Sequence, residues 1–151
     1  MRQGNIVSRV FIYSVLLLLV AAISAKIMTF INAPRLLQYE NPVLRLPERT
    51  VIVISVVLEV AVIVGVMRIS SHRTKALVIL WMCALFAAYR VLASMSPLPP
   101  QMCPCLGRLE WLGIPDHFAD SLAKALLIYM AVGAFLVVLY TRNRRRPGPE
   151  A

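Results

Sequence analysis

Two cysteines separated by a single proline are the residues of this sequence whose types and spacing most directly indicate chemistry. Cys103, Pro104 and Cys105 form the segment Cys-Pro-Cys. A disulfide between cysteines one residue apart closes a very small ring, which forces the two Cα atoms toward the short end of the range that disulfides tolerate. A strained disulfide is reduced more easily than one that only holds a fold together. The spacing therefore favours a pair that exchanges electrons with a partner thiol.

Two other interpretations of this pair remain open. Cys103 and Cys105 carry soft sulfur atoms of the kind that binds Cu(I). Met102 and His117 would then complete a copper site. The pair could also be an inert feature of a loop. The third cysteine, Cys83, lies within an apolar stretch and is predicted to be a buried packing residue.

Four charged residues interrupt the apolar parts of the chain: Lys26, Glu59, Arg90 and Lys124. Charged side chains within membrane spans are costly to desolvate, so each one is a candidate functional residue. At 1.5 Å per residue from the outer ends of the spans, the three cations lie about 5–8 Å deep and Glu59 about 12 Å deep. Glu59 is the only acid among them and is predicted to bridge two or more of the cations. For each cation, snorkelling to the lipid headgroups is the competing interpretation.

These residues belong to four apolar stretches, which cover residues 10–31, 51–69, 76–95 and 122–140. As a helix each stretch would be roughly 28–33 Å long, enough to cross the hydrocarbon core of a bilayer. All ten prolines lie outside the stretches, as expected because proline interrupts helical hydrogen bonding. The sequence therefore predicts one all-α membrane domain over residues 1–151, a four-helix transmembrane bundle. A cleaved signal peptide is the alternative interpretation of the first stretch.

The composition is also typical of a membrane protein. Hydrophobic residues make up 60% of the chain, against about 45–50% in soluble domains. The net charge is +9, from 16 Lys and Arg against 7 Asp and Glu. The basic residues lie between the apolar stretches, where membrane topology explains them better than nucleic-acid binding does. A nucleic-acid-binding domain, a disordered chain and a disulfide-rich secreted module are therefore excluded.

The basic residues are distributed unevenly between the two sides of the predicted bundle. Nine lie near the N-terminus, near the link between the second and third stretches and in the tail 141–151, whereas four lie in the loops 32–50 and 96–121. The positive-inside rule then predicts that both termini are cytoplasmic and that the two loops face outward. In an inner (plasma) membrane this orientation puts the Cys-Pro-Cys segment in an oxidising periplasm or exterior. The Arg-rich tail is predicted to anchor this topology, and binding to anionic lipid is a compatible role.

Lys26, Glu59 and the segment Cys-Pro-Cys-Leu-Gly at 103–107 together resemble the methylamine-utilisation MauE group, part of the wider DoxX-like family of four-helix membrane proteins. Pro104 replaces the middle glycine of the family's usual Cys-Gly-Cys-Phe-Gly, and a leucine replaces its phenylalanine. The resemblance covers about residues 10–140. MauE is implicated in maturing a disulfide-rich periplasmic dehydrogenase subunit, and DoxX relatives include a subunit of a quinone-reducing sulfur enzyme. The resemblance therefore implies membrane-bound redox support.

The expected function is thiol–disulfide redox support for an exported partner, with Cys103 and Cys105 as the exchanging pair. The chain would act as a membrane thiol–disulfide oxidoreductase or as a redox accessory subunit. The four intramembrane charges would support the pair by stabilising a thiolate or by holding a quinone-like electron acceptor. The expected partners are the lipid bilayer and a periplasmic thiol or disulfide client. A non-enzymatic membrane scaffold or assembly factor and a copper-handling protein are the alternatives.

Overall fold

The computed structural model describes residues 3–32, 40–41, 43–95 and 116–143 of the chain. Within these ranges the chain forms four helices and no strand, and the helices are α1 (Gln3–Asn32), α2 (Glu48–Arg68), α3 (His72–Ser94) and α4 (Asp116–Asn143). All four are long and apolar enough to cross a membrane. The predicted all-α fold with four membrane-spanning helices is therefore confirmed.

All four helices begin before the apolar stretches that predicted them, by three to seven residues. α2 begins at Glu48, directly after Pro47, whose backbone is extended (φ −53°, ψ 137°). Proline has no N–H to donate and a fixed φ, so it is well placed immediately before a helix. α4 begins at Asp116, whereas its apolar stretch begins only at residue 122. The polar first turns of α4 matter for the site, because they contain Asp120.

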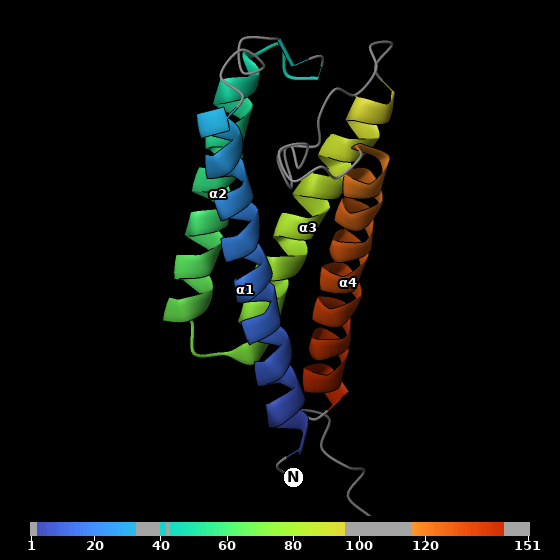
Figure 1. Ribbon diagram of the computed structural model, residues 1–151. Coiled ribbons are helices and arrows are strands. Elements are labelled where there is room, and N and C mark those ends of the chain that lie inside the picture. The colour runs from blue at the N-terminus through green and yellow to red at the C-terminus, as the bar shows by residue number, and fades with distance from the viewer. Residues whose placement is uncertain (1–2, 33–39, 42, 96–115, 144–151) are drawn as a thin grey trace, which may run out of the picture.

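The helices are arranged as two neighbouring pairs, α1 beside α2 and α3 beside α4, and the α3–α4 contact is the most extensive (Figure 1). The chain runs up and down, so α1 and α3 begin, and α2 and α4 end, at the same end of the bundle (Figure 1, bottom). We call this the basic end, because Arg68, Arg73 and Arg142 lie there. The opposite end, where α1 and α3 end, is called the loop end.

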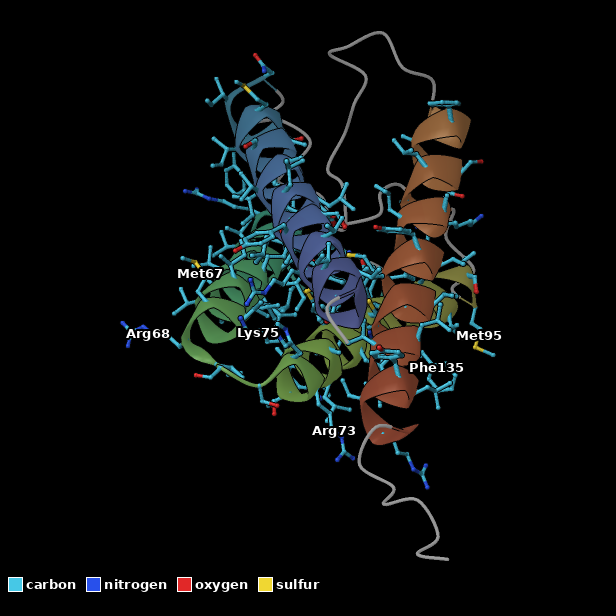
Figure 2. The ribbon with its side chains drawn as sticks, turned by 90° about the horizontal axis from the view of Figure 1, so that it is seen from below. Met67, Arg68, Arg73, Lys75, Met95 and Phe135 are labelled. Atoms are coloured by element: carbon cyan, nitrogen blue, oxygen red, sulfur yellow. The ribbon has the colours of Figure 1, made fainter. Side chains whose placement is uncertain are left out.

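Large apolar side chains cover the outside of the bundle. Every helix exposes several of them, for example Leu17 on α1, Met67 on α2, Trp81 on α3 and Ile128 on α4. Met67 points away from the bundle in the view from below (Figure 2). Soluble proteins rarely expose contiguous apolar surface of this kind. Such a surface is expected to face the hydrocarbon of a bilayer, which agrees with the lengths of the helices.

The interior of the bundle differs between its two halves. The apolar core lies toward the basic end, and all four helices contribute to it through Ile12, Val15, Val62, Val66, Ile79, Met82, Ala134 and Val137. Most of the buried polar side chains lie nearer the loop end, and these are Lys26, Thr29, Asn41, Glu48, Ser55 and Glu59. The buried polar residues that are candidates for chemistry therefore lie mainly on the loop-end side of the apolar core.

A glycine on α4 makes room for an aromatic side chain of α1. The ring of Phe11 packs directly against Gly133, in the space that a Cβ atom at position 133 would occupy. Phe11 also meets the ring of Tyr129, with 5.9 Å between the ring centroids. The Tyr129 hydroxyl is hydrogen-bonded to Ser14 Oγ at 2.8 Å. Small residues of this kind let membrane helices pack closely where no hydrophobic effect drives them together.

Candidate functional site

A buried ion pair between α1 and α2 is the central feature of the site. Lys26 Nζ donates a hydrogen bond to Glu59 Oε1 at 2.5 Å. Lys26 is 0% exposed and Glu59 is 1% exposed. The ammonium group also lies 5.8 Å from the centroid of the Phe86 ring on α3, within the range of a cation–π interaction.

Helical periodicity explains why both charges point inward. On α1, Lys26 follows the buried Leu19 and Ala22 at intervals of three and four residues. On α2, Glu59 lies four residues after the buried Ser55 and three before the buried Val62. These spacings place each charged residue on the buried face of its helix. A charge on such a face needs a partner, because an unpaired buried ion is strongly destabilising.

The ion pair leaves hydrogen-bonding capacity unused. Glu59 Oε2 is buried and has no hydrogen-bond partner within residues 3–32, 40–41, 43–95 and 116–143. Two hydroxyl groups lie one turn closer to the loop end on the same helices, Thr29 on α1 and Ser55 on α2. Each donates to a carbonyl of its own helix, at 3.0 Å and 2.9 Å respectively. The carboxylate can therefore accept a further hydrogen bond or a proton inside the bundle.

The other two predicted charges belong to a separate group on α3 and α4. Arg90 forms an ion pair with Asp120, and Lys124 Nζ lies 2.6 Å from the second carboxylate oxygen of Asp120. The side chain of Arg90 is 16% exposed and that of Lys124 is 61% exposed. The exposure of Lys124 agrees with snorkelling toward the headgroups.

The predicted cluster of four charges is thus divided into two groups. Glu59 pairs with Lys26, and the carboxylate that joins Arg90 to Lys124 is Asp120. The sequence interpretation missed Asp120 because this residue precedes the apolar stretch 122–140 and was assigned to the loop 96–121. One signal could have found it. Asp120 lies four residues before Lys124, the spacing at which opposite charges meet on a helix.

A second polar network at the loop end was also missed. Asn41 is buried, and its side-chain amide donates hydrogen bonds to Glu48 Oε2 at 2.9 Å and to the Tyr89 hydroxyl at 2.6 Å. Its side-chain carbonyl accepts hydrogen bonds from the backbone N–H groups of Val43 and Leu44. Asparagine commonly stabilises turns in this way. The network connects the turn before α2 to both α2 and α3.

The cysteine pair lies outside the described residues. Met102, Cys103 and Cys105 belong to the segment 96–115, and the side chain of His117 is likewise not described. No group of three metal-ligating side chains occurs in the part of the chain that the structure describes. Cys83 is buried in the apolar core, as predicted for a packing residue.

These features define a four-helix membrane-spanning protein with a buried Lys–Glu ion pair. Comparisons with protein-family models, with curated proteins and with solved structures find no match. The resemblance to the MauE and DoxX-like proteins therefore stays a hypothesis that depends on the residues named for it.

Proposed function

We propose that this protein supports thiol–disulfide exchange for an exported partner, in the manner of MauE, with Cys103 and Cys105 as the exchanging pair. The observation that carries the proposal is the position of the buried charges. The Lys26–Glu59 pair lies between the apolar core and the loop end, and Asp120 joins two cations close to the loop end. The cysteines fall in the sequence segment that connects α3 to α4 at that end.

The exchange would proceed through a mixed disulfide. A thiolate of the client attacks the Cys103–Cys105 disulfide, and a second client thiolate then releases the client as a disulfide. The pair is left as two thiols, having taken up two electrons and two protons. A membrane quinone is the class of acceptor proposed to reoxidise it, becoming a quinol by taking up the same electrons and protons. The cations near the loop end would favour the attacking thiolate.

The buried carboxylate would take part in the proton transfer that accompanies this exchange. Glu59 Oε2 is a buried acceptor that has no hydrogen-bond partner among the residues that the structure describes. Lys26 holds the other carboxylate oxygen and fixes the orientation of the group. In this proposal Glu59 acts as a supporting residue rather than as the redox group itself.

The distribution of charge supports an orientation with the basic end in the cytoplasm. The exposed Arg68, Arg73 and Arg142 lie at this end, and positively charged residues are retained on the cytoplasmic side of membranes. The loop end would then face the periplasm or exterior, where disulfides persist. The proposed location is the plasma (inner) membrane.

A redox titration of the purified protein tests the proposal. The fraction of free thiol is measured at a series of potentials with a maleimide that shifts the mass of each alkylated cysteine. We expect a two-electron transition at a potential above about −300 mV. Structural disulfides usually have potentials below this value. Cys103→Ser and Cys105→Ser should each abolish the transition. Cys83→Ser is the matched control and should leave the transition unchanged, because Cys83 is buried in the core.

Two thiols that remain fully alkylated at every potential, including the most oxidising one, would refute the exchange mechanism. Metal analysis of the same preparation would then distinguish the two alternatives. Bound copper that is lost in Cys103→Ser would favour copper handling, and its absence would favour a scaffold.

A further inference from the structure

The basic end carries charges that no described residue neutralises. Arg68, Arg73, Lys75 and Arg142 lie there, and their side chains form no ion pair or hydrogen bond with any residue that the structure describes. The three arginines are exposed and Lys75 is half-buried. We call these four residues the basic surface.

The loop end has a balanced set of charges by comparison. Among the described residues it contains four cations, Arg45, Arg49, Arg90 and Lys124, and four acids, Glu40, Glu48, Asp116 and Asp120. Every acid in residues 3–32, 40–41, 43–95 and 116–143 lies either in this set or in the buried Lys26–Glu59 pair. The basic surface therefore has no described acid near it.

The position of the basic surface indicates what neutralises it. α2 and α3 are 21 and 23 residues long, so the two ends of each helix lie roughly 30 Å apart. This distance matches the thickness of the hydrocarbon core, so the basic surface lies where the core meets the headgroups. Figure 2 shows Arg68 and Arg73 extending away from the α2–α3 turn. Beside them, the exposed Met67 lies at the edge of the apolar surface. Long basic side chains in this position keep their stems on apolar surface while their charged groups reach lipid phosphates.

We propose that the basic surface binds the headgroups of anionic phospholipids in the leaflet at the basic end. Guanidinium groups bind phosphate oxygens through paired hydrogen bonds, and an anionic headgroup supplies the negative charge that a zwitterionic one does not. Each basic residue near an anionic membrane surface strengthens the association by about fivefold. The surface lies at the opposite end of the bundle from the cysteine segment, so the inference does not depend on the proposed redox function.

Spin-label electron paramagnetic resonance tests this inference on the full-length protein. The protein is reconstituted in phosphatidylcholine that contains a trace of spin-labelled phosphatidylglycerol or of spin-labelled phosphatidylcholine. The spectra give the fraction of each label that is immobilised against the protein. We expect phosphatidylglycerol to be preferred about two- to threefold, because the fivefold effect of each basic residue is averaged over all lipids around the bundle. The preference should weaken in about 1 M salt, where the Debye length is only about 3 Å.

A matched pair of double variants locates the effect. Arg68→Gln with Arg73→Gln removes two cations from the basic surface and should abolish at least half of the preference. Arg45→Gln with Arg49→Gln removes two exposed cations from the loop end and should change the preference much less. All four residues are exposed, so circular dichroism and detergent melting should show that both variants are folded.

Two results would overturn the proposal. The first is a protein with no preference for phosphatidylglycerol. The second is an equal loss of preference in the two double variants, which would show only a general effect of net charge.

Discussion

Replacing Glu59 by Gln is expected to destabilise the bundle strongly. The Lys26 Nζ and Glu59 Oε1 atoms lie 2.5 Å apart, which corresponds to a Coulomb attraction of about 7 kcal/mol at an effective dielectric constant of about 20. Desolvation of the two ions offsets much of this attraction, at several kcal/mol per ion. The substitution would leave the ammonium group buried without a counter-charge. We therefore expect the free energy of unfolding to fall by about 3–5 kcal/mol.

A double-mutant cycle separates the pair from its surroundings. Lys26→Met leaves the carboxylate without its cation and should also destabilise the protein. The double variant Lys26→Met/Glu59→Gln contains no buried charge and should be much more stable than the two single changes together would predict, with a coupling of at least about 2 kcal/mol. Lys124→Gln is the control, because this lysine is largely exposed and its ion pair should contribute less than about 1 kcal/mol.

The assay is reversible unfolding in mixed micelles of a mild detergent and dodecyl sulfate, followed by circular dichroism. A change of less than about 0.5 kcal/mol in Glu59→Gln would refute the reasoning, because breaking a buried pair should cost several times more. The carboxyl group would then be neutral in the folded protein, and the amide would simply replace it.

Two further predictions concern packing and topology. Gly133→Ala should destabilise the bundle by about 1–3 kcal/mol, because the new methyl group displaces the aromatic ring packed there. Gly65→Ala meets no atom within 4 Å and should be neutral or slightly stabilising, so equal losses in the same unfolding assay would contradict the packing argument. In a variant without native cysteines, an impermeant maleimide applied to intact cells should label a cysteine placed at Leu44 but not one placed at Ser71. The reverse pattern would invert the proposed orientation.

The sequence was sufficient to predict the helices and the need of Glu59 for a partner inside the bundle. Apolar stretches of about twenty residues identify membrane helices because the thickness of the hydrocarbon core sets their length. A glutamate deep within such a stretch needs a partner or a proton, because an unpaired charge there is costly, whereas a lysine can also snorkel to the headgroups. The sequence did not show which cation pairs with Glu59, and the structure shows that it is Lys26.

The remaining contacts depend on information that a hydropathy pattern does not contain. Periodicity shows which face of a helix is buried, but it does not show which helix lies opposite. Glu59 was therefore expected to serve several cations, whereas Asp120 joins Arg90 to Lys124. Asp120 was not predicted as part of the site, because hydropathy places an acid outside an apolar stretch in a loop. The hydrogen bonds of Asn41 were equally hidden, because they depend on how a turn folds back onto two helices.

The two ion pairs that join different helices have a consequence for how the protein enters the membrane. Lys26 and Glu59 belong to consecutive helices, and so do Arg90 and Asp120. A lysine, arginine or aspartate at the centre of an isolated inserting helix costs about 2.5–3.5 kcal/mol, and less nearer its ends. A helical hairpin that inserts as a unit carries both members of its pair and adds no net charge from that pair. We therefore expect the chain to be integrated as two successive hairpins, with α1 held at the translocon until α2 has been synthesised.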